Sequence, residues 1–260
     1  MNIHFKGDDI DLNLSEKGSG KAVLLLQGWG TNTAVYERLT ESMSAYCRVI
    51  TYDIPGFGAS SEPSFAFSTD DYGDFALAVL DKLDIKDVSL VGHSHGGRTI
   101  LNLLSREKLP VSVEKAVLID SAGIVPKKTF MQKLKIRKYK LGKALLSSAP
   151  VKALFPNALE NYKNSHGSAD YKAASEIMRA SLVKVVNDDY TERISSVNVP
   201  TLLIWGDRDT ATPISDAHIM EKKIRDCGLV TVAGGSHYSF LDNPNLVYGA
   251  LRSFFGGIRL

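Results

Sequence analysis

Ser94 lies in a sequence pattern that can make a serine side chain reactive. Residues 92–96 read G-H-S-H-G and fit the pattern G-x-S-x-G. The apolar run Val88–Val91 precedes them and predicts a strand, and helical patterning follows from about Gly96. Glycines on both sides suit a sharp strand-to-helix turn, which leaves no room for side chains beside the serine. The pattern therefore predicts that Ser94 is a nucleophile on a strained turn.

A serine hydroxyl is a weak nucleophile at neutral pH and needs a base, which in turn needs an orienting carboxylate. Asp209 follows the apolar run Leu202–Trp205, and His237 follows Leu229–Val232 and a glycine-rich loop. Both residues thus come just after predicted strands, and the carboxyl ends of parallel strands meet at one edge of a sheet. The sequence predicts that Ser94, Asp209 and His237 form a triad at that edge.

The elements around these residues alternate between buried strands and helices. Near-continuous apolar runs of this kind are typical of a parallel sheet covered on both faces. The fold class we predict is α/β, a doubly wound and mostly parallel sheet. An N-terminal antiparallel hairpin is expected at Asn2–Phe5 and Ile10–Leu14. The other expected strands are Val23–Leu26, Val49–Asp53, Val88–Val91, Ala116–Ile119, Leu202–Trp205 and Leu229–Val232, and the expected helices are Thr69–Leu83, Thr99–Leu104, Ser215–Ile224 and Asn245–Phe255.

Residues 123–190 interrupt this alternation, because they show helical patterning and no convincing strand. We interpret them as a helical cap inserted after the sixth predicted strand, with residues 1–122 and 191–260 forming the core domain. Residues 121–159 contain nine lysines and arginines and no acidic residue. This basic segment is explained by a solvated helix face, by attraction of an anionic substrate, or by adsorption to an anionic membrane surface.

The motifs together resemble the α/β-hydrolase-fold family over essentially the whole chain. They are Q-G-W-G at 27–30, D-I-P-G-F-G-A-S at 53–60, G-H-S-H-G-G at 92–97, W-G-D-R-D at 205–209 and G-S-H at 235–237. The resemblance is to capped serine hydrolases, including carboxylesterases and C–C bond hydrolases. It implies that Ser94 attacks the substrate, His237 acts as general base and then acid, and Asp209 orients His237.

The resemblance also implies an oxyanion hole made by the backbone N–H groups of Trp29 and His95. The family usually has histidine where this chain has Gln27, which alters the surroundings of the hole and not its backbone donors. Two other aspartates are alternatives for the acid: Asp207, interpreted as facing solvent or capping the turn, and Asp120, a position that some members of the fold use.

The candidate pocket residues come from the first loop, the elbow and the cap. They are Gln27, Trp29, His95, Phe57, Phe130 and Leu134. The last two belong to an apolar stripe with Leu141 and Leu145, which we expect to pack against the core or to contact substrate. His93 is interpreted as structural. Arg98, four residues after Ser94, is interpreted as a structural salt bridge or as part of the site.

We predict a serine hydrolase that cleaves a small ester through an acyl-enzyme, a carboxylic ester hydrolase. Three alternatives remain: a C–C bond hydrolase; a lyase like the menaquinone-pathway SHCHC synthase, whose S-x-G-G-R pattern residues 94–98 match; and a small-molecule receptor that keeps the triad. A small-molecule substrate is the partner expected.

Composition limits the other possibilities. The chain of 260 residues has a net charge of +2, which gives no indication of nucleic-acid binding. No apolar run approaches the length of a membrane span, so no stable membrane insertion is expected. No cluster has metal-ligand spacing, and we predict neither metal nor other cofactor. Two cysteines without a C-x-x-C motif and no apparent signal peptide indicate a cytoplasmic protein, as a monomer or homodimer.

Overall fold

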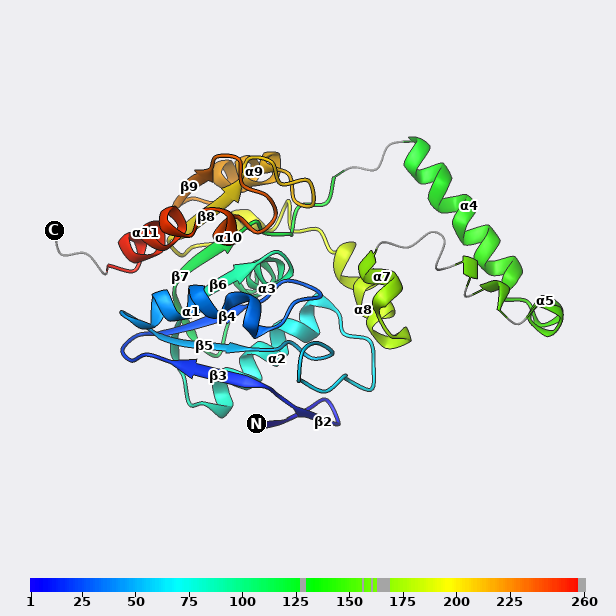
Figure 1. Cartoon of the computed structure of the whole chain (residues 1–260), viewed down its shortest axis with the longest axis horizontal. Coiled ribbons are helices and arrows are strands. Elements are labelled where there is room, and N and C mark those ends of the chain that lie inside the picture. The colour runs from blue at the N-terminus through cyan, green and yellow to red at the C-terminus, as the bar shows by residue number, and fades with distance from the viewer. Residues whose placement is uncertain (127–129, 156, 160, 163–168, 257–260) are drawn as a thin grey trace.

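The structure is a computed structural model that describes residues 1–126, 130–155, 157–159, 161–162 and 169–256. Its centre is a seven-stranded sheet in the order β3-β5-β4-β6-β7-β8-β9 (Figure 1). Only β3 is antiparallel to its neighbour, and the other neighbouring strands are parallel. The strands are β3 (Leu14–Lys17), β4 (Ala22–Leu26), β5 (Arg48–Tyr52), β6 (Asp87–His93), β7 (Ser112–Ile119), β8 (Thr201–Gly206) and β9 (Cys227–Val232).

The N-terminal segment forms three strands where the sequence predicted two. β1 (Asn2–Phe5) and β2 (Asp8–Asp11) make a separate hairpin. Lys6 and Gly7 both have positive φ, at 50° and 91°, so they form a tight two-residue turn and β2 begins at residue 8. The following residues, Leu14–Lys17, then pair with β5. The strand before the helical insertion is therefore the seventh in the chain and not the sixth.

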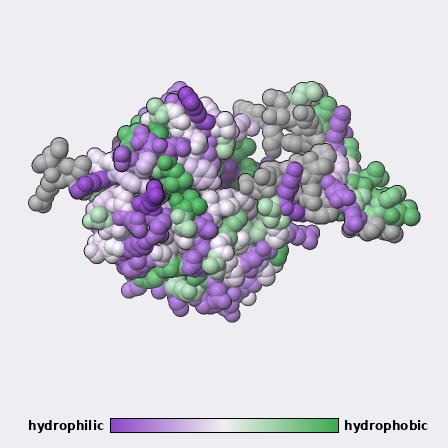
Figure 2. All heavy atoms as spheres, viewed as in Figure 1, coloured by the Kyte–Doolittle hydropathy of each residue, from purple (hydrophilic) through white to green (hydrophobic). Residues whose placement is uncertain are grey.

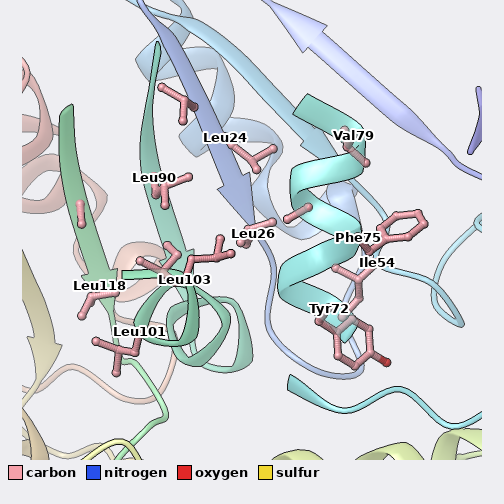
Figure 3. Close-up of a cluster of buried hydrophobic side chains, with 14 of the residues drawn as sticks. Leu24, Leu26, Ile54, Tyr72, Phe75, Val79, Leu90, Leu101, Leu103 and Leu118 are labelled. Atoms are coloured by element: carbon pink, nitrogen blue, oxygen red, sulfur yellow. The ribbon is translucent and has the colours of Figure 1, made fainter. Parts of the chain in front are cut away.

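Helices cover both faces of the sheet, as predicted. Alternate residues of β4 point to opposite sides: Leu24 and Leu26 belong to one apolar cluster, and Val23 and Leu25 to the other. The first cluster packs against α2 (Thr69–Lys82), α3 (His95–Leu104) and α9 (Ile214–Lys223), and the second against α1 (Glu37–Ser44) and α11 (Pro244–Phe254). Figure 3 shows Tyr72, Phe75 and Val79 of α2 beside Leu24 and Leu26.

The helix α1 and the short helices η1 (Thr33–Tyr36), η2 (Ile194–Ser196) and α10 (Ser239–Asp242) were not predicted. α2 is well defined by its own sequence, because Ser68 and Asp71 form a reciprocal capping box at its start. By contrast, α1 has only eight residues, and η1 begins at a cap made by Asn32. Elements of this length depend on tertiary packing more than on local pattern.

Within residues 123–190, every described regular element is a helix. These are α4 (Phe130–Leu146), α5 (Ala149–Leu154), α7 (Ala169–Ala173) and α8 (Glu176–Val186). α8 packs against the core through the buried side chains of Met178, Leu182 and Val185. α4 and α5 extend away from the sheet (Figure 1).

The apolar stripe of α4 does not pack as predicted. Leu134 is 37% exposed, Leu141 63% and Leu145 66%. Figure 2 shows apolar atoms on the surface of this outer part of the molecule. A helix-period pattern identifies which residues share a face, but it does not determine what that face contacts.

A buried and an exposed leucine allow a test of which parts of the protein contribute to its free energy of unfolding. Leu24→Ala removes a fully buried side chain between β4 and α2. We expect it to lower the free energy of unfolding by about 2–5 kcal/mol, because a cavity remains. Leu145→Ala on α4 is the matched control and should change it by no more than about 0.5 kcal/mol. Urea denaturation followed by circular dichroism measures both, and equal losses would show that α4 packs on the core in solution.

Candidate active site

Ser94 occupies the turn between β6 and α3 in a strained backbone conformation. Its φ is 51° and its ψ is −112°, a region that residues with side chains rarely adopt. The turn fits only because its neighbours are glycines. A Cβ on Gly96 would lie 2.1 Å from the carbonyl oxygen of Leu26, and one on Gly92 would lie 2.6 Å from the backbone of Gly96. The glycines of the motif thus allow α3 to start against the end of β4.

Three side chains from three strand ends form one hydrogen-bonded chain. Ser94 Oγ lies 2.9 Å from Nε2 of His237, and Nδ1 of His237 lies 2.8 Å from Oδ2 of Asp209. A carboxylate can only accept, so we assign the His237 proton to Nδ1, which leaves Nε2 to accept from Ser94. The geometry allows His237 to take the serine proton while Asp209 stabilises the resulting charge.

Asp209 is buried and held by several donors. Its carboxylate accepts hydrogen bonds from the backbone N–H groups of Ala211 and Thr212 and from the Thr212 hydroxyl. Burial acts to raise the pKa of this carboxyl, but the hydrogen bonds from His237 and Thr212 outweigh it and leave the pKa below its usual range. Asp209 is therefore ionised at neutral pH.

The two alternative aspartates make different contacts. Asp207 is exposed and accepts from the backbone N–H of Gly234. Asp120 is fully buried, and it accepts from the N–H of Gly206 at 2.8 Å and from that of Ser239 at 3.0 Å. It thus joins the end of β8 to α10, while burial raises its pKa to about 6. The structure places Asp209, and neither of the other two, against His237.

The N–H groups of Trp29 and His95 are available for a ligand. His95 is the first residue of α3, where an N–H has no partner within the helix. In the part of the chain that the structure describes, neither N–H donates a hydrogen bond. Both residues line the same cavity as Ser94. Two such donors beside a nucleophile can stabilise an oxyanion.

His93 joins the first loop to the loop that carries His237. The N–H of Gly28 donates to the Tyr36 hydroxyl at 2.8 Å, which lies 2.8 Å from Nδ1 of His93. Nε2 of His93 lies 2.7 Å from the carbonyl oxygen of His237. A carbonyl only accepts, so Nε2 carries the proton and Nδ1 accepts from Tyr36. Burial lowers the pKa of His93 to about 3, so this ring is neutral and has a structural role.

The cavity beside Ser94 has a volume of about 440 Å³. Trp29 and His95 are among the residues that line it. Several other residues of the wall were not predicted, and they include Ile124, the α8 residues Leu182, Val185 and Val186, Thr212 and Asp216. Within the insertion, the sequence pointed to Phe130 and Leu134 as the pocket wall, whereas the structure uses Ile124 at its start and the helix α8 near its end.

The other predicted pocket residues lie elsewhere. Gln27 is fully buried, and its side chain donates to the carbonyl of Thr31. Phe57 lines a second cavity of about 480 Å³ and packs edge-on against the Trp29 ring. Leu134 lies on the exposed face of α4 and does not line the cavity beside Ser94. The side chain of Phe130 falls outside the described residues.

The described residues contain neither a candidate metal site nor a candidate membrane-spanning helix. No group of three or more histidine, cysteine, aspartate or glutamate side chains is arranged to hold a metal ion there. No helix among those residues is long and apolar enough to cross a membrane.

Comparison with known proteins identifies the family. The family model of the α/β hydrolase fold matches residues 21–244, and the chain belongs to this family. It is 28% identical over 252 residues to a putative non-heme chloroperoxidase of Synechocystis, covering 88% of each chain. It is 26% identical over 262 residues to the 2-(acetamidomethylene)succinate hydrolase of Mesorhizobium japonicum, covering 94% of this chain and 91% of the relative. A thermophilic esterase from Thermogutta terrifontis has the same fold, with a TM-score of 0.76, 18% identity and coverage of 100% and 99%. The chain is an enzyme of the α/β-hydrolase fold.

The buried Tyr36 hydroxyl gives a prediction with a matched control. Tyr36→Phe leaves the N–H of Gly28 and Nδ1 of His93 without a partner, so we expect the free energy of unfolding to fall by about 1–3 kcal/mol. The Tyr46 hydroxyl is buried and has no hydrogen-bond partner in the described structure, so Tyr46→Phe should be nearly neutral. Urea titration of both variants measures the difference. Similar losses would contradict a supporting role for Tyr36.

Asp216 in the cavity wall gives a prediction on pH. Burial raises its pKa to about 6, and the charge of Asp209 acts in the same direction. Between about pH 4 and 6 the folded state holds a proton that the unfolded chain has released, so this group makes stability fall as pH rises. Asp216→Asn cannot bind or release this proton, so the variant lacks the fall in stability that Asp216 causes. The difference in free energy of unfolding, variant minus wild type, should therefore be about 1–2 kcal/mol larger at pH 7 than at pH 4. Asp226→Asn is the control, because it removes a negative charge from an exposed position. If the difference in stability between Asp216→Asn and wild type does not change with pH, the raised pKa of Asp216 is contradicted.

Proposed function

We propose that this protein is a serine hydrolase that cleaves a small carboxylic ester through an acyl-enzyme on Ser94. The single observation that carries the proposal is the hydrogen-bonded chain from Ser94 through His237 to Asp209, which opens into a cavity with two unused backbone N–H groups. The family membership supports hydrolysis as the reaction class.

The reaction follows from this arrangement. Ser94 Oγ attacks the ester carbonyl as its proton moves to Nε2 of His237, and the oxyanion accepts hydrogen bonds from the N–H groups of Trp29 and His95. His237 then gives the proton to the departing alkoxide, so the alcohol leaves and the acyl group stays on Ser94. Water repeats the sequence: it loses a proton to His237, attacks the acyl carbon and releases the acid, and Ser94 regains its proton.

Residues 123–190 act, in this proposal, as the cap of the site, on a core formed by residues 1–122 and 191–260. α8 supports this role because Leu182, Val185 and Val186 line the cavity. An apolar wall over the serine reduces the access of water and strengthens the electrostatic interactions of the transition state.

Hydrolysis of p-nitrophenyl esters from acetate to octanoate tests the proposal. Ser94→Ala should lower the rate constant kcat by about 10⁴-fold or more, and Asp209→Asn by about 10⁴-fold. Ser105→Ala is the control, because the Ser105 hydroxyl binds the carbonyl of Leu101 at the end of α3, away from the cavity. Wild-type turnover no faster than that of Ser94→Ala would overturn the ester proposal and favour C–C bond hydrolysis, elimination or a receptor.

A further inference from the structure

Arg98 is a buried cation in the wall of the cavity that contains Ser94. Its side chain is only 7% exposed, and it lines the cavity together with Ser94 and His237. From the sequence, one interpretation of Arg98 is a structural salt bridge. The structure instead shows Nη1 donating to the backbone carbonyls of Val185 and Asp188, with no carboxylate within ion-pair distance among the described residues.

The hydrogen bonds to these two carbonyls use only one of the three nitrogens of the guanidinium, Nη1. The carbonyls lie at the carboxyl end of α8, where the helix dipole is negative and favours a cation. Nε and Nη2 of Arg98 donate no hydrogen bond within the described structure. The guanidinium therefore has N–H donors to spare beside a ligand cavity. A carboxylate matches such a planar set of donors better than a neutral group does.

The nearest acidic side chains are engaged with other groups. Asp188 accepts a hydrogen bond from the Tyr190 hydroxyl at 2.5 Å. Asp189 accepts from the backbone N–H groups of Val125 and Thr191. Both attract Arg98 from a distance without pairing with it. Because burial of an unpaired charge is costly, an anionic ligand at this place would gain affinity by completing the pair.

The position of Arg98 limits the size of the ligand. Arg98 follows Ser94 by four residues, so the Cα atoms of the two residues are separated by roughly 6 Å along the axis of α3. Leu182, Val185 and Ile124 add apolar wall to the same cavity. A substrate that reaches both groups therefore has a short apolar chain between its ester carbon and its anionic end.

We propose that Arg98 binds a carboxylate of the substrate, so that the enzyme favours esters that carry a carboxylate a few carbon atoms from the ester bond. This inference rests on the proposed role of Ser94. The carboxylate belongs either to the acyl part or to the alcohol part of the ester, and matched substrates distinguish the two.

Two pairs of esters, each differing by a carboxylate in place of a methyl group, test the proposal. Methyl valerate and monomethyl glutarate test the acyl side, and propyl acetate and 3-acetoxypropanoate test the alcohol side. Alkyl esters are used because aryl half-esters hydrolyse through their own carboxylate. Released alcohol is followed by proton NMR, which gives kcat/KM for each substrate.

Wild type should prefer the charged member of at least one pair, and Arg98→Gln should reduce that preference by about 10- to 100-fold. Arg98→Lys should keep part of it, because the charge remains without the planar donors. Arg193→Gln is the control, since Arg193 is exposed and lies over the ring of Tyr190. An equal loss for charged and neutral esters in Arg98→Gln would show that Arg98 only holds α8, and would overturn the proposal.

Calorimetric binding of valerate and of its neutral amide, valeramide, separates this inference from the proposed function. Wild type should bind valerate at least 10-fold more tightly than valeramide, and Arg98→Gln should remove most of this difference. This measurement needs no turnover. If neutral and charged esters are both left intact, the ester proposal fails, while the binding preference still decides the role of Arg98. Equal binding of valerate and valeramide by wild type, or a preference unchanged in Arg98→Gln, would overturn it even in an active esterase.

Discussion

The close approach of α3 to the end of β4 is the constraint on which the site depends. The backbone of Gly96 lies so near the carbonyl of Leu26 that no side chain fits between them, and Gly97 stands equally close to Ser121 after β7. The loops that follow two neighbouring strands thus hold the start of α3 from both sides. This fixes the positive φ of Ser94 and leaves the N–H of His95 without a hydrogen bond to any of the described residues. Backbone strain at the serine persists because the surrounding packing determines it.

Buried polar groups also hold the loops that carry His237 and Asp209, the residues hydrogen-bonded in series with Ser94. His93, one residue before Ser94, accepts from Tyr36 and donates to the backbone of His237. Asp120, at the end of the next strand, joins β8 to α10. Buried groups of this kind are costly when unpaired, so each one strongly favours a single arrangement of its loop. The position of His237 is therefore set by the central strands as well as by its own glycine-rich loop.

The features predicted correctly from the sequence are those determined by neighbours along the chain. Glycine spacing and short apolar runs identified the turn at Ser94, six strands of the main sheet and the strand ends that carry Asp209 and His237. Tyr36 was not predicted, because its hydroxyl contacts His93, which is distant in the chain, and no local pattern marks it. Thr212 was also missed, although it follows Asp209 by only three residues and donates to its carboxylate. The cavity wall was assigned to the wrong helix for a similar reason. α4 and α8 both have apolar residues, and only three-dimensional packing shows that α8 lies over the serine.

Three histidines, His93, His95 and His237, line the cavity that contains Ser94, and one of them has the contacts that proton transfer from the serine requires. Burial lowers the pKa of both His93 and His95 to about 3, so neither ring takes up a proton at neutral pH. His93 also has both nitrogens engaged, one with Tyr36 and one with the backbone of His237. Only His237 combines contact with Ser94 and a buried, ionised carboxylate at its other nitrogen. Because both rings are neutral, neither competes with His237 for a proton, and the carboxylate that contacts His237 directly is that of Asp209.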